Sequence, residues 1–148
     1  MMPTLRDESV RRGLAARLEH VTPETKARWG SLDAPRMICH LSDSLDSGLG
    51  VFPVTVAGPW VLRHFPVKQL ALYVVPFPKG AKGPRELFVA TPGDFETDRR
   101  GVVERMERMA AVPSGQGPPH PLFGPVNNEE WNALHWKHMD HHLRQFGC

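Results

Sequence analysis

Residues 131–147 read WNALHWKHMDHHLRQFG and contain four of the eight histidines of the chain. In an α-helix, at about 100° per residue, His138 and His142 lie roughly 40° apart on one face, one turn above the other. This spacing lets two imidazoles meet at one metal ion, so paired histidines on a helix are a recognised metal-binding pattern. Trp131 and Leu134 share the same general face. The stretch therefore predicts a helix whose histidines lie within the stripe that faces the protein interior.

His141 lies on the other flank of His138, about 60° around the helix axis. Buried imidazoles need hydrogen-bond partners, and protonating several of them close together is costly. A cation shared by these histidines resolves both difficulties. Two alternatives stay open: the histidines form an exposed, solvated patch, or they are core residues whose hydrogen bonds are satisfied by the protein.

A metal ion needs at least a third ligand, and His40 is the candidate. It stands between Met37 and Leu41 in a run with helical spacing, so we expect it to face inward on its own helix. Facing helices of a bundle commonly supply the ligands of a core site, although His40 alone also fits a core histidine. Three neutral nitrogens leave coordination positions open for water or substrate, and they suit zinc, nickel, copper or iron. Asp43 and Asp140 are candidates to orient the ligands, with surface acids as the alternative.

Capping residues and apolar spacing predict the other helices of the chain. We expect helices over residues 7–19, from 22 to 30, from 31–33 to 48, over 94–111, and from 127 or 128 to 146. The second of these is short, and the other four are long. Because no convincing array of strands accompanies them, the sequence predicts an all-α four-helix bundle.

A proline-rich connection separates the second and third long helices. Residues 50–93 contain seven prolines. Residues 60–64 and 67–75 are expected as short helices interrupted at Pro66, although the second also fits a strand. Residues 77–85, FPKGAKGPR, are predicted to be a loop. A long connection of this kind can form a lid over a site.

Length and composition restrict the class of protein. At 148 residues the chain fits a single domain over residues 1–148. The net charge of +2 is too balanced to indicate a nucleic-acid partner. The least charged stretch, residues 47–62, is shorter than the ~20 apolar residues of a membrane span. Two cysteines cannot form a disulfide framework, and the first residues show no apolar signal region, so we expect a cytoplasmic protein.

The inward His40 and the HxxHH pattern of residues 138–142 resemble the DinB/YfiT-like superfamily of metal-binding four-helix bundles. The segments RWGSLDAPRMICHLSDSL, PFPKG and HPLFGPVNNEEWNALHWKHMDHHLRQFG resemble a DinB-like subfamily of unknown function. The resemblance implies a metal site formed by His40, His138 and His142, with His141 as the extra histidine often found beside the last ligand. Many members carry HHRGQ where this chain has HHLRQ, so the arginine is displaced to Arg144.

The resemblance leaves three functions open. Some members of the superfamily are thiol-dependent transferases or isomerases, and others have no known activity. The first possibility is a metalloenzyme, a transferase or hydrolase that uses a low-molecular-weight thiol, with zinc or nickel as its ion. The second is a non-catalytic metal-binding bundle, and the third is an interaction protein whose histidines are residual or sense pH. The sequence names neither catalytic residues nor a substrate.

The apolar stretch over residues 51–75 holds more hydrophobic side chains than four helices can readily cover. We expect it either to fold back over its own bundle or to form a surface for a second copy of the chain. The resemblance favours the homodimer. The residues expected to be exposed are Trp60, Leu62, Phe65, Leu70, Leu72 and Tyr73.

Overall fold

The computed structural model describes residues 2–148. Over that range the chain is all-helical, with five α-helices, two short 3₁₀ helices and two isolated β-bridges in place of strands. The elements are, in chain order, α1 (Glu8–Glu19), α2 (Ala34–Gly48), η1 (Trp60–Arg63), α3 (Val67–Tyr73), η2 (Arg85–Phe88), α4 (Phe95–Ala111) and α5 (Asn128–Gln145). The predicted all-α class is confirmed. None of the described helices is long and apolar enough to cross a membrane.

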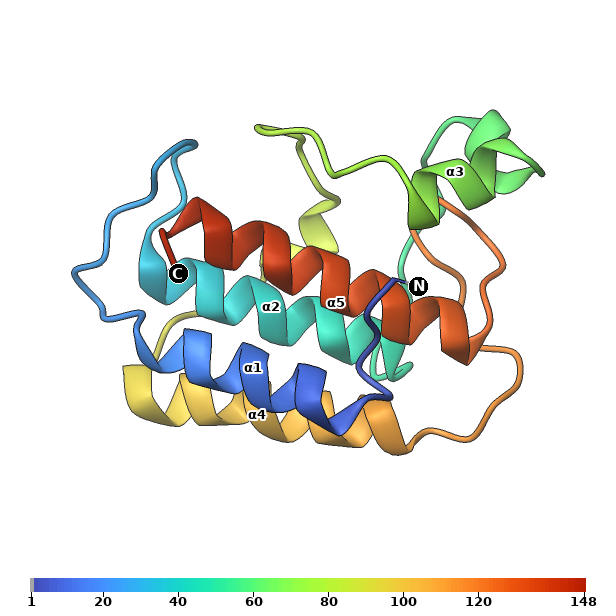
Figure 1. Cartoon of the computed structure of the whole chain (residues 1–148). Helices are drawn as coiled ribbons and strands as arrows, with labels where there is room; N and C mark the ends of the chain where they lie inside the picture. The colour runs from blue at the N-terminus through green and yellow to red at the C-terminus, as the bar shows by residue number, and fades with distance from the viewer. Residues whose placement is uncertain (1) are drawn as a thin grey trace.

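The four long helices α1, α2, α4 and α5 lie side by side (Figure 1). Helix α2 packs against α4 and α5, and α1 contacts the same two helices. Apolar side chains from all four helices meet in one buried core, to which Leu18, Ile38, Met106 and Leu143 each contribute. This packing fixes the distance between α2 and α5, the two helices that carry the histidines.

Each long helix begins at a residue whose side chain caps its first turn. Asp7, Asp33 and Asp94 each accept a hydrogen bond from a backbone N–H of the helix that follows. Asn127 and Glu130 form a reciprocal capping box at the start of α5. These caps explain why the predicted ranges of the four long helices agree closely with the structure.

The short helix predicted from residue 22 to residue 30 is wrong. The backbone N–H of Thr25 donates to the carbonyl of Thr22 at 3.0 Å, and the Thr25 hydroxyl accepts from the N–H of Thr22 at 2.8 Å. The two threonines therefore close a turn, because their side chains compete for the backbone groups that a helix would use. For residues 67–75 the helix prediction is confirmed by α3, and the strand alternative is wrong.

The connection between α2 and α4 is anchored to the bundle at α3. Nζ of Lys137, on α5, donates to the carbonyls of Ala71 and Leu72 at 2.6 and 3.2 Å, and also to the carbonyl of Val75. Carbonyls at the C-terminal end of a helix have no partner within the helix, so a buried ammonium satisfies them. After this anchor the chain forms the predicted loop and reaches η2 at Arg85.

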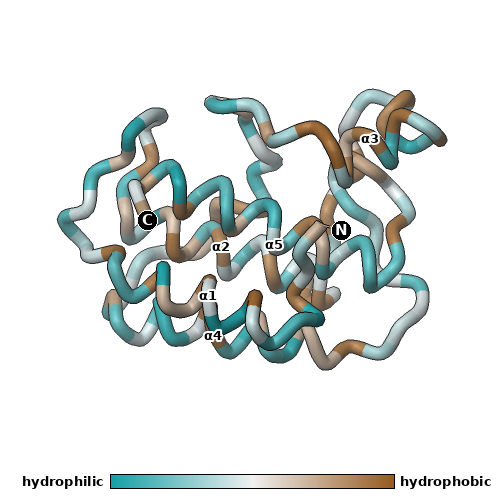
Figure 2. Tube along the Cα trace, viewed as in Figure 1, coloured by the Kyte–Doolittle hydropathy of each residue, from teal (hydrophilic) through white to brown (hydrophobic). Residues whose placement is uncertain are grey.

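The apolar stretch around η1 and α3 is exposed in part. Figure 2 shows hydrophobic chain at and just after the end of α3, at the edge of the molecule. Leu72 is fully buried and packs into the core, so its predicted exposure is wrong, and Leu62 is partly buried. The other four predicted residues are exposed: Trp60 by 70%, Phe65 by 82%, Leu70 by 49% and Tyr73 by 43%.

Candidate metal centre

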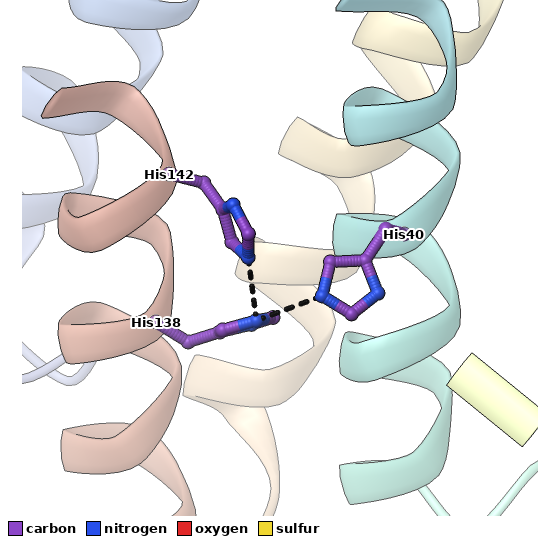
Figure 3. Close-up of side chains that lie close together, drawn as sticks. All are labelled: His40, His138 and His142. Atoms are coloured by element: carbon purple, nitrogen blue, oxygen red, sulfur yellow. Dashed lines mark hydrogen bonds between the residues drawn. The ribbon is translucent and has the colours of Figure 1, made fainter. Parts of the chain in front are cut away.

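Three imidazoles from two helices converge on one point (Figure 3). His40 projects from α2, and His138 and His142 project from successive turns of α5. Nε2 of His138 lies 3.0 Å from Nε2 of His40 and 3.0 Å from Nε2 of His142. The ligand atoms of the three residues all lie within 4.8 Å of one another. The structure thus brings together the three predicted residues, in an arrangement that could hold a metal ion.

The ring of His40 is oriented by η2. Its Nδ1 lies 2.7 Å from the backbone carbonyl of Leu87, and a carbonyl oxygen only accepts, so Nδ1 carries the proton. Phe88 stacks on the same ring, with the ring centroids 4.1 Å apart and the planes 4° from parallel. In neutral His40 the other nitrogen, Nε2, therefore presents a lone pair toward His138.

The ring of His142 is oriented in the same way by a side-chain amide. Nε2 of Gln145 donates to the backbone carbonyl of Trp29 at 2.9 Å, which fixes the orientation of the amide. Oε1 of Gln145 then accepts from Nδ1 of His142 at 2.7 Å. In neutral His142, Nε2 consequently presents a lone pair as well.

Hydrogen bonding alone cannot satisfy this cluster. The Nε2 atom of His138 faces two lone pairs, those of His40 and His142, and a neutral imidazole has at most one proton on that atom. In at least one of the two 3.0 Å contacts, two nitrogen lone pairs must therefore face each other without a proton between them. A cation among the three nitrogens removes this conflict. The donor set fits a divalent ion that prefers imidazole, such as zinc or nickel.

The three imidazoles are held in the neutral form that binds a metal. Burial lowers the pKa of His142 to about 3, and the neighbouring His40 adds to the effect. Burial also lowers the pKa of His138 well below 6.5, with the imidazoles around it as the next cause. The pKa of His40 is lowered by burial, against the opposing effects of the Leu87 carbonyl and the Asp43 carboxylate. Few protons therefore compete with a metal ion at neutral pH.

Asp43 supports the centre through the backbone of the connection. Its Oδ2 accepts hydrogen bonds of 3.1 Å from the backbone N–H groups of Val89 and Ala90, directly after η2. The same segment supplies the Leu87 carbonyl that orients His40. The predicted role of Asp43 as an orienting acceptor is thus carried out indirectly, by fixing η2 rather than by contacting the ring.

The remaining polar candidates divide between the cavity and the surface. His141 lines the cavity beside the ligands and lies edge-on to Trp29, with the ring centroids 5.8 Å apart. Arg144 pairs with Asp140 at 3.0 Å, and Asp140 also binds Arg17 at 2.8 Å. In the described structure Asp140 and Arg144 therefore belong to an ion-pair network rather than to the histidine centre.

A cavity of about 220 Å³ opens onto the three histidines. Its walls come from α2, α5, η2, the loop after α3 and the loop before α5. They are mostly apolar and aromatic, and include Phe77, Leu87, Phe88, Leu122, Trp131 and Leu134. An ion at the centre would have ligand space on one side and the packed bundle on the other.

Two further histidines in the cavity wall escaped prediction. His120 accepts at Nδ1 from the backbone N–H groups of Leu122 and Phe123, at 3.0 and 3.3 Å. His135 is buried against Trp131, and its Nε2 has no hydrogen-bond partner among the described residues. Helical spacing places His135 one turn before His138, which is a weak signal. His120 lies in a loop and has no periodicity that would reveal it.

Fold and site together define a class: an all-helical protein with a candidate metal centre made of three histidines from two helices. The chain belongs to the family described as "Protein of unknown function (DUF1569)", whose model matches residues 13–147. No curated protein and no solved structure matches the chain. The family match covers all three histidines but assigns them no function.

Proposed function

We propose that this protein is a divalent-metal-binding four-helix bundle of the DinB/YfiT-like type. His40, His138 and His142 hold one zinc or nickel ion per chain and leave further coordination positions open. The observation that carries this proposal is that three Nε2 atoms lie together without enough protons to hydrogen-bond to one another. The Leu87 carbonyl and the Gln145 amide hold the protons of His40 and His142 on Nδ1, so the Nε2 atoms of these two residues present lone pairs.

Metal titration of tag-free protein tests this proposal. Zinc and nickel are added separately to chelator-treated protein, and the bound metal is counted by calorimetry and elemental analysis. We expect one ion per chain, and loss of binding in His138→Ala and His142→Ala. His64→Ala, an exposed histidine outside the cavity, is the matched control and should bind as the unmodified chain does. Unchanged binding in His138→Ala contradicts the proposed ligand set.

The open side of the centre favours an enzyme that activates a small thiol, a transferase or hydrolase. A bound ion supplies Lewis acidity, which lowers the pKa of a coordinated thiol or water. The three histidines hold the ion, and the mostly apolar and aromatic walls of the cavity surround its open side. A screen of low-molecular-weight thiols against electrophilic acceptors tests the activity. Turnover must require both the metal and His138; without such turnover, the protein is a metal-binding bundle in which the ion ties α2 to α5.

The exposed side chains of η1 and α3 favour a homodimer. Helix α3 lies at one end of the molecule (Figure 1), and Trp60 and Phe65, which precede it in the chain, are exposed. Exposed apolar patches usually mark a partner surface. A second copy of the chain, related by a two-fold axis, is the commonest such partner. Size-exclusion chromatography with light scattering should find a dimer at micromolar concentration, and a monomer for Phe65→Ser. A monomeric unmodified chain rejects the dimer.

A further inference from the structure

The wall of the cavity carries almost no formal charge. Among the described residues that line it, none is aspartate or glutamate, and Lys82 is the single lysine or arginine. Burial lowers the pKa of two histidines of the wall, His120 and His135, to about 3, so both are neutral near pH 7. The described wall of the cavity therefore supplies no carboxylate, and the carboxylate of Asp43 acts on His40 from outside that wall.

This distribution of charge determines which ligands an ion in the centre would accept. A divalent ion held by three neutral nitrogens receives no negative charge from its ligands, and Lys82 adds a positive charge in the cavity wall. In a site with low dielectric constant an uncompensated charge is costly, so an anionic ligand is strongly favoured over a neutral one. A cationic ligand is disfavoured further on the same ground.

The size and lining of the cavity indicate the size and polarity of the part of the ligand that carries the anionic group. A cavity of roughly 150 Å³ lined by apolar side chains holds benzene. The cavity here has about 220 Å³, which leaves space for one aromatic ring and an attached anionic group. Phe77, Leu122 and Trp131 supply flat or branched apolar surface for such a ring.

We propose that the cavity binds a small organic monoanion with an apolar body about the size of an aromatic ring. Its carboxylate or thiolate is directed at the centre formed by His40, His138 and His142, and its apolar body packs against the aromatic wall. This inference rests on the metal-binding function proposed above, and it names the class of ligand that the open side of that centre accepts.

Calorimetry on zinc-loaded protein tests the ligand class with four probes of similar shape. Benzoate and benzenethiolate carry the anionic group, benzamide is neutral and benzylammonium is cationic. We expect at least one of the two anions to bind about tenfold or more tightly than benzamide, with benzylammonium weaker still. Acetate, which lacks the ring, should also bind more weakly than benzoate. The inference is overturned if neither benzoate nor benzenethiolate binds more tightly than benzamide, or if acetate binds as tightly as the tighter of these two anions.

Two pairs of variants place the ligand in this cavity. Ala81→Trp fills the cavity from its exposed loop and should lower the affinity for the anion about tenfold or more, while Ala111→Trp, at the end of α4, should not. Lys82→Glu should weaken binding of the anion, and Lys26→Glu, outside the cavity, should leave the affinity for the anion unchanged. None of the four positions is a proposed metal ligand, so all four variants should keep the metal. Anion binding that survives in Ala81→Trp rejects the cavity as its site.

The same series separates the two proposals. If the protein binds zinc but has equal affinity for the anionic and neutral probes, the proposed ligand class is wrong and the metal-binding function is unaffected. Protein that binds no metal overturns both proposals. If the tighter of the two anions binds equally well with and without zinc, the ligand class is overturned, because binding of the anion then does not depend on the ion.

Discussion

Gln145 fixes the ring of His142: its Oε1 accepts from Nδ1 of His142 at 2.7 Å, and its Nε2 donates to the Trp29 carbonyl at 2.9 Å. The backbone between α1 and α2 thereby determines which nitrogen of a proposed ligand carries the proton. Partners of this kind orient the ligands of metal sites and raise their basicity.

Gln145→Leu is expected to lower metal affinity about 10- to 100-fold, because His142 loses the acceptor that fixes its tautomer. Gln145→Glu keeps an acceptor for Nδ1 and should retain most of the affinity. Zinc titration by calorimetry measures both. If the two variants bind alike, the hydrogen bond to His142 is not what positions the ligand.

The Asp43 carboxylate is expected to hold η2 against α2. Asp43→Ala removes an acceptor shared by the N–H groups of Val89 and Ala90, and should lower the free energy of unfolding by about 2–4 kcal/mol. It should also weaken metal binding, since His40 then loses the fixed carbonyl of Leu87. Urea unfolding of the metal-free protein and zinc titration check the two effects.

Asp46→Ala provides the matched control for Asp43. Asp46 lies on the same helix and accepts from Nε of Arg105 at 2.9 Å, on the side of α4. Its removal should destabilise the fold while leaving metal affinity unchanged. An equal loss of metal affinity in both variants would assign the effect to general destabilisation.

The sequence predicted the helices that carry the centre because their signals are local. Asp33 caps α2, the Asn127–Glu130 box caps α5, and the spacing of His138 and His142 follows from the helix alone. His40 required one further step, the expectation that two inward faces meet.

The surroundings of the centre could not be predicted in this way. The Leu87 carbonyl is a backbone group, which no residue type signals, and it lies in the proline-rich connection. Its position depends on long-range contacts such as Asp43 with Val89. His120 reaches the cavity through a loop for the same reason. At Thr22 and Thr25 the prediction is wrong for a different reason: a local signal is present, but it fits both a helix and a turn.

Lys137 is expected to control the stability of α3. Lys137→Met keeps the aliphatic stem but leaves the carbonyls of Ala71 and Leu72 without their buried donor, at a cost of about 1–3 kcal/mol. Hydrogen exchange should show faster opening of α3, with the four long helices less affected. Arg144→Met, on the exposed side of α5, is the control and should leave α3 unchanged. Uniform loss of protection across the chain would place the role of Lys137 in the whole fold.

The stability of the metal-free protein is expected to fall as the pH drops below about 6.5. His120 and His135 have a folded-state pKa of about 3 because burial disfavours their charged form, whereas an unperturbed histidine titrates near 6.5. Between these two values the unfolded chain binds more protons than the folded chain. As the pH falls through this range, the free energy of unfolding therefore decreases by up to about 1.4 kcal/mol per pH unit for each histidine. Above about pH 6.5 the stabilising contribution of each histidine is fully present. The three clustered histidines act in the same direction.

Urea unfolding of chelator-treated protein, from about pH 7 to about pH 4, measures this slope. His120→Asn keeps an oxygen to accept from the N–H groups of Leu122 and Phe123 but cannot titrate in this range. It should reduce the slope by the contribution of one histidine, even if it lowers stability at every pH. Added zinc should raise stability near pH 7 and lose its effect in acid, because protons compete for the nitrogens. A free energy of unfolding that stays constant down to about pH 5 would mean that these imidazoles are not buried in the neutral form.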